Sequence, residues 1–110
     1  MNEFTMSQPP VRTFAVISSG TPVAYAQATV SGSAISLPSI PTGANRALVQ
    51  LETGDTIRWR DDGTAPTSSV GMVLYPANII ELTSAQSIAK FKAIGIVGGG
   101  VTLNVSYYIK

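Results

Sequence analysis

Hydrophobic and polar residues alternate along this chain in short runs, as they do in β-strands that turn one face toward a core. The alternation is clearest near the C-terminus, where Val101, Leu103, Val105 and Tyr107 fall on one face and polar residues on the other. We expect the first face to be buried. Runs rich in β-branched and aromatic residues predict strands at 13–18, 23–30, 33–37, 46–52, 56–60, 70–75, 78–82, 91–97 and 101–109.

Clusters of turn-forming residues separate these runs. Ser31-Gly32-Ser33 predicts a turn between two strands, and Gly98-Gly99-Gly100 predicts a hairpin turn, because glycine adopts positive φ without a steric cost. The triplet lacks the Lys-Ser/Thr and helix that a phosphate loop requires. One short helical turn is expected, with Thr83 or Ser84 as its N-cap, crossing between sheets with Ile88 packed beneath it.

The pattern as a whole predicts an all-β fold, either a single-domain antiparallel β-sandwich or a jelly-roll-like barrel. A length of 110 residues fits one domain, which we place at 11–110. Polar residues and two prolines predict a flexible, extended N-terminal arm over 1–10. This arm is either plain terminal disorder or a strap across a neighbouring subunit, anchored by Phe4 and Met6.

The composition narrows the range of partners. Only 12% of residues are charged, 45% are hydrophobic and the net charge is +1, and so charge-poor a surface favours association with itself or with a larger assembly. The seven basic residues are dispersed, which argues against nucleic-acid binding. No apolar run approaches the roughly 20 residues of a membrane span, and no secretory signal begins the chain, so we expect neither membrane insertion nor export.

The chain contains no histidine or cysteine, which removes the usual triad base and the thiolate ligands. We therefore expect no enzyme activity, no catalytic residue, no cofactor and no metal. Asp61 and Asp62 are adjacent, but neighbours on a strand point to opposite faces and make a poor acid–base pair, whereas Asp62-Gly63 fits a turn. Calcium held by Asp61, Asp62 and Thr64 stays an alternative, although no EF-hand spacing is present.

Two arginines flank the single tryptophan of the chain. Arg58 and Arg60 are two residues apart and share one face of a strand, so Trp59 points to the other face, which we expect to be the core. The arginines are either solvated and paired with Asp61, Asp62 or Glu52, or they bind carboxylates of a partner subunit, a task that suits the guanidinium fork. The candidate partner-interface residues are Phe4, Met6, Arg58 and Arg60.

The segment from Ile57 to Met72 reads Arg-Trp-Arg-Asp-Asp-Gly-Thr, then Pro, then Val-Gly-Met, and the chain also contains Phe91-Lys92-Ala93-Ile94 and the ending Leu103-Asn104-Val105-Ser106-Tyr107-Tyr108. In these features residues 46–108 resemble small β proteins encoded among tailed-bacteriophage virion genes. The resemblance implies a phage structural protein that decorates or cements the capsid at capsomer junctions. Its implied partners are the major capsid protein and itself, often as a trimer, on the capsid surface of a virion assembled in the host cytoplasm.

Two further functions stay open at this point. One is a tail or head-fibre attachment protein, which would be present in few copies per virion. The other is a carbohydrate-binding module, which displays several exposed aromatic rings on a rigid face. The sequence places most aromatic residues at strand positions where packing is the rule, and it shows no aromatic cluster.

Overall fold

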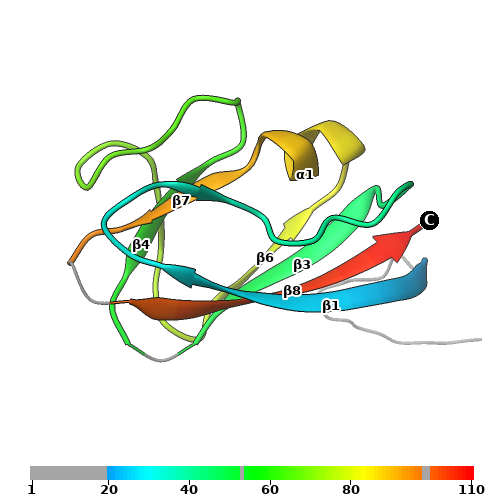
Figure 1. Ribbon diagram of the computed structural model, residues 1–110, viewed down its shortest axis with the longest axis horizontal. Coiled ribbons are helices and arrows are strands. Elements are labelled where there is room, and N and C mark those ends of the chain that lie inside the picture. Colours follow the sequence, from blue (N-terminus) through cyan, green and yellow to red (C-terminus); the bar gives the residue numbers. More distant parts are fainter. Residues whose placement is uncertain (1–19, 53, 98–99) are drawn as a thin grey trace, which may run out of the picture.

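The computed structural model describes residues 20–52, 54–97 and 100–110, which form two four-stranded sheets packed face to face (Figure 1). No helix within these ranges is long and apolar enough to cross a membrane. The elements are β1 (Thr21–Val30), β2 (Ile35–Ser36), β3 (Arg46–Leu51), β4 (Ile57–Arg60), β5 (Met72–Leu74), β6 (Ile79–Leu82), α1 (Ala85–Lys90), β7 (Lys92–Gly95) and β8 (Val101–Ile109).

The strands are ordered β1-β8-β3-β6 in one sheet and β2-β7-β4-β5 in the other. β1 pairs with β8, β2 with β7, β3 with β6 and β4 with β5, all antiparallel, so the chain is a long hairpin that has been rolled up. Among these strands, every connection except β4–β5 passes from one sheet to the other. This is the topology of a jelly roll. The expected all-β antiparallel sandwich is confirmed, and the jelly-roll alternative describes its strand order.

The core lies between the sheets and follows the predicted alternation. Leu103, Val105 and Tyr107 of β8 are fully buried, and Val101 is nearly so. From the other sheet, Trp59 faces the core as expected and stacks on Phe91, with ring centroids 5.6 Å apart and planes inclined by 17°. An offset stack of this kind adds about 0.5–1.5 kcal/mol to the burial of the rings. The remaining fully buried large side chains are Val30, Val49, Leu51, Ile57 and Ile88.

The helical turn is present where the sequence predicts it. Ser84 is the N-cap, and its hydroxyl oxygen accepts a hydrogen bond from the Ser87 backbone N–H at 3.0 Å. Ile88 is the buried residue of α1. The helix connects β6 of one sheet to β7 of the other, so its expected role as a crossing between sheets is confirmed.

One expectation about how the strands connect fails. The hairpin predicted at residues 98–100 is wrong, because β7 and β8 belong to different sheets. The neighbours of β8 are β1 and β3, and those of β7 are β2 and β4, so the two strands cannot pair with each other. The turn at residues 31–33 likewise joins strands of different sheets. The arm with Phe4 and Met6, and the strand predicted at 13–18, lie outside the described residues.

Two buried side chains carry polar groups, and each of these groups has a partner. The Tyr107 hydroxyl donates a hydrogen bond to the Pro38 carbonyl, and burial raises the pKa of this phenol to about 12. Arg46 is 3% exposed; it forms an ion pair with Glu81, and its guanidinium lies 4.7 Å from the centroid of the Tyr108 ring. Both side chains therefore meet the requirement that a buried polar group has a partner.

Candidate partner-binding site

The loop of residues 61–71 joins β4 to β5 and forms the tip of the rolled hairpin. It begins beside α1, where Asp61 meets Ser87, and arches over the upper left of the view in Figure 1. Functional residues are often found on loops that a rigid scaffold positions. The two arginines singled out by the sequence lie where this loop begins, at the end of β4.

Arg58 holds the loop in shape. Its Nη1 donates to the Gly71 carbonyl at 2.8 Å, and its Nε donates to the Ser68 carbonyl at 3.1 Å. The sequence predicts carboxylates as intramolecular partners of this arginine, but the structure gives it backbone oxygens instead. A charged donor strengthens such bonds, so Arg58 stabilises the far end of the loop against the strand on which it lies.

The second half of the loop is a tight turn closed by Thr67. Its hydroxyl oxygen accepts hydrogen bonds from the backbone N–H groups of Val70 at 3.0 Å and Ser69 at 3.2 Å, and Thr67 and Val70 also exchange backbone bonds. Pro66 is buried beneath this turn, and Gly71 leaves it with a φ of 140°. Val70 and Met72 are consequently displayed to solvent, 52% and 60% exposed.

Arg60 and Asp62 form a two-point ion pair at the start of the loop. Arg60 Nε donates to Asp62 Oδ1 at 3.1 Å and Nη2 donates to Oδ2, while Oδ1 also accepts the Thr64 backbone N–H at 3.2 Å. This is the turn chemistry that Asp62-Gly63 predicts, with Gly63 at a φ of 88°. The bond to Arg60 is the main cause that lowers the pKa of Asp62, and the same bond raises the pKa of Arg60.

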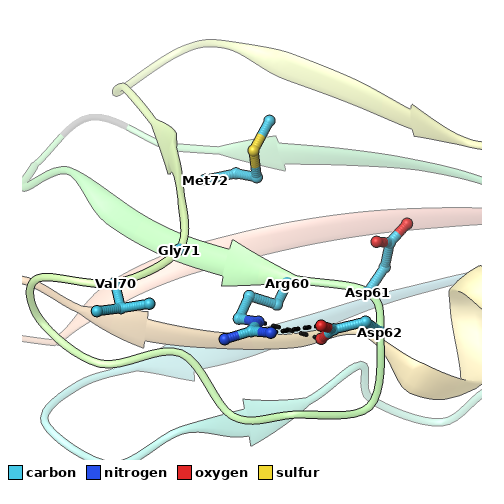
Figure 2. A pocket seen from close by; sticks show the side chains of 6 residues that line it. All are labelled: Arg60, Asp61, Asp62, Val70, Gly71 and Met72. Carbon is cyan, nitrogen blue, oxygen red and sulfur yellow. Dashed lines mark hydrogen bonds and ion pairs between the residues drawn. The ribbon is translucent and has the colours of Figure 1, made fainter.

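Asp61 points away from Asp62 and binds a different element (Figure 2). Its Oδ2 accepts a hydrogen bond from the Ser87 hydroxyl of α1 at 2.6 Å, which ties the loop to the helix. The two carboxylates therefore do not converge on a common point, as calcium ligation would require. Within the described ranges, no group of three or more acidic residues is placed to hold a metal ion.

A shallow hollow of about 260 Å³ opens between the two halves of the loop (Figure 2). One wall is charged and the other is apolar, and its lining residues are Arg60, Asp61, Asp62, Val70, Gly71 and Met72. General acid–base catalysis needs a group that titrates near neutral pH. The pKa values of Asp62 and Arg60 both move away from neutrality, so neither of these two groups is tuned for proton transfer near neutral pH.

The outer face of the same sheet carries positive charge. Arg58 and Arg60 share this face, as predicted, and Lys92 pairs with Arg60 in the strand register. Lys92 Nζ donates to the Ser36 hydroxyl at 3.2 Å. Glu52, which the sequence offers as a partner of the arginines, instead binds Asn104. The arginines are thus engaged within the chain, and their role toward a partner stays a prediction.

Sequence reasoning missed the apolar wall of the hollow. Val70 and Met72 fall in a predicted strand and look like core residues, and Tyr75 and Ile79 nearby are also exposed, by 61% and 57%. β5 and β6 each pair with a single neighbouring strand and so lie at the edges of their sheets. Apolar residues gathered at an edge are a feature of association surfaces, but only the strand order reveals that these strands are edges.

Comparison with known proteins yields little. No protein-family model matches the chain, and no curated protein matches it. Among solved structures, the fold is similar to a chain described by "Bacillus endospore appendages form a novel family of disulfide-linked pili", with 13% identity over 92% of this chain and 100% of the other. The TM-score is 0.41, at which the likeness carries no argument. This chain has no cysteine, and the phage resemblance stays a prediction from sequence.

Proposed function

We propose that this chain is a non-enzymatic structural protein of a tailed-bacteriophage virion, which decorates or cements the capsid. In this proposal it binds the major capsid protein and further copies of itself at capsomer junctions, on the capsid surface. The observation that carries the proposal is a braced loop that exposes Val70 and Met72 beside the cationic Arg60. The sequence resemblance supplies the phage context.

The chemistry of the hollow supports a protein partner. Methionine and arginine are enriched in protein interfaces, and Met72 and Arg60 both line the hollow. Arg58 and Thr67 already hold the backbone of this loop by hydrogen bonds. Binding a partner therefore costs little conformational entropy for ordering the loop. A structural protein needs contact area of this kind and no reactive group.

The charges define which partner surface fits. Asp62 engages Nε and Nη2 of Arg60, and the guanidinium offers its remaining N–H groups to a carboxylate outside the chain. Lys92 adds a second cation on the same face. A partner segment that places an apolar side chain in the hollow and an Asp or Glu beside it would match both walls.

A pair of matched variants tests the role of the hollow. Met72→Asp and Arg60→Glu should each lower incorporation into virions by about tenfold or more, because each removes a central contact. Val97→Asp is the control, since Val97 is 55% exposed and does not line the hollow. Quantitative mass spectrometry counts the copies of each variant per virion. The variants are compared at equal expression level, after their melting temperatures have been shown to match the wild type. Equal incorporation of all three variants would contradict the proposal.

The copy number of the wild-type protein separates the two virion locations. A capsid cement protein should have a copy number of the same order as that of the major capsid protein, and its deletion should make the virion less stable. A tail or head-fibre attachment protein would be confined to a few copies at a vertex or tail, and such a count would exclude the cement function.

The N-terminal arm is tested separately. We propose that Phe4 and Met6 anchor it on a neighbouring subunit, so deletion of residues 1–10 should reduce oligomer size while leaving the melting temperature of the domain unchanged. Sedimentation velocity compares the two forms. An unchanged oligomer would remove the arm from the interface.

A further inference from the structure

A second cluster of side chains lies on the outer face of the sheet β1-β8-β3-β6, apart from the loop. The register places Gln27, Asn104 and Gln50 in one row across three strands. Tyr25 and Glu52 lie diagonally on either side of this row, both within hydrogen-bonding reach of Asn104. We call these five residues the Tyr25 cluster. They take no part in the proposed contact at the hollow.

Asn104 is the hub of the Tyr25 cluster. Its Oδ1 accepts hydrogen bonds from the Tyr25 hydroxyl at 2.6 Å and Gln27 Nε2 at 2.8 Å. Its Nδ2 donates to Glu52 Oε2 at 2.9 Å and to Gln50 Oε1 at 3.4 Å. All four hydrogen-bonding positions of the amide are used, so Asn104 fixes the orientation of its neighbours on the sheet surface.

The Tyr25 ring lies along the sheet. Tyr25 pairs with Ser106, but its hydroxyl reaches Asn104, which is a diagonal neighbour about 7–8 Å away between Cα atoms. The ring must therefore extend over the surface instead of standing away from it. Its exposure of 62% means that a ring face meets solvent, and the adjacent Ser106 is too small to cover it.

The cluster keeps polar atoms for a ligand. Gln27 Oε1 and Glu52 Oε1 are acceptors outside the network around Asn104, and Gln50 Nε2 is a donor outside it. A ligand that fits must offer several hydroxyl donors and a flat face of C–H groups. The negative face of an aromatic ring attracts the slightly positive C–H groups of such a ligand.

We propose that the Tyr25 cluster binds a neutral carbohydrate, with a sugar ring stacked on Tyr25 and its hydroxyls bound to Gln27, Gln50 and Glu52. Nucleobases also stack on aromatic rings, but their phosphates need cationic partners. The cluster contains no Lys or Arg, and Glu52 adds a negative charge. The charge therefore selects an uncharged polyhydroxyl ligand over a nucleic acid.

The test is a titration of the ¹⁵N-labelled full chain with maltohexaose, cellohexaose and chitohexaose, followed by NMR. We expect saturable shifts confined to amides of β1, β3 and β8 with at least one sugar, and none with heparin or oligo-dT. Tyr25→Ala should weaken binding by about tenfold or more, because it removes the ring on which the sugar stacks. Tyr75→Ala is the matched control, because Tyr75 is 61% exposed and lies outside the cluster.

Three results would overturn the proposal: no saturable shift with any of the sugars, equal loss of binding in both tyrosine variants, or binding of oligo-dT at the cluster. Tyr25→Phe is a second check on folding and mechanism. It keeps the ring and loses the bond to Asn104, so its affinity should fall between wild type and Tyr25→Ala. None of these outcomes bears on the hollow, which the virion-incorporation test addresses.

Discussion

Replacing Tyr107 by phenylalanine tests how the core holds its one buried phenol. The ring is fully buried, and its hydroxyl ties β8 to the segment between β2 and β3 through the Pro38 carbonyl. The variant keeps the packing and removes the hydrogen bond, leaving a half-buried carbonyl without that donor. We expect a loss of about 1–2 kcal/mol in the free energy of unfolding at neutral pH.

The same substitution has a pH signature. The pKa of Tyr107 is raised to about 12 in the folded state, while an unfolded tyrosine titrates near 10. The unfolded chain therefore loses its proton first, and the wild type loses stability as pH rises from about 10 to about 12. The Phe variant lacks this group, so the difference in stability between the two proteins should shrink over that interval.

Urea unfolding at a series of pH values from 7 to 11.5 measures both effects, with Tyr75→Phe as the control for an exposed phenol. The control should stay within about 0.5 kcal/mol of wild type at neutral pH. If Tyr107→Phe cost nothing at neutral pH, the bond to Pro38 would be energetically silent. If the cost were constant up to pH 11.5, burial would not be what retains the proton.

Three other perturbations follow from the geometry. Gly71→Ala should lower the free energy of unfolding in urea by about 1–3 kcal/mol, because Gly71 has a φ of 140° and an added Cβ would lie 3.0 Å from Pro66 Cβ. Gly32→Ala is the control and should be nearly neutral, because an added Cβ there has no atom within 4 Å. Ser84→Ala should cost about 1 kcal/mol by removing the N-cap, while a Thr there should retain most of it. Acidification should release the loop by protonating Asp62. Because the folded-state pKa of Asp62 is lowered, the ion pair with Arg60 should persist below the pH at which a free Asp is protonated, and it should be lost as pH falls through the folded-state pKa. NMR shifts of the amides of residues 61–71 would follow this loss.

The sequence was a good guide to local structure. The alternation in β8 predicts its buried face residue by residue, and the cap at Ser84 and the turn at Asp62-Gly63 also form as the local chemistry indicates. Both depend on interactions between residues a few positions apart. The direction of Trp59 follows from the same period of two along β4.

Sheet membership and the hollow could not be predicted in this way. The hairpin expected at residues 98–100 fails because β7 and β8 each pair with strands more than 30 positions away in the chain. No local pattern encodes such pairings. The hollow depends on Arg58 donating to the carbonyls of Ser68 and Gly71. Backbone oxygens are present at every residue, so the sequence cannot indicate which of them an arginine will bind.

The rolled hairpin also determines when the domain can form. Thr21 pairs with Ile109, so sheet β1-β8-β3-β6 lacks its central strand β8 until the last of these residues has been synthesised. Of the strands that the structure describes, only β4 and β5 are neighbours both in sequence and in a sheet. Folds in which most strand pairs join distant residues fold slowly, in about milliseconds to seconds, and the partly folded chain exposes unpaired strand edges during that time. The nascent chain is thus most prone to aggregate before β8 emerges, and a variant that weakens β8 should first reduce the yield of soluble protein.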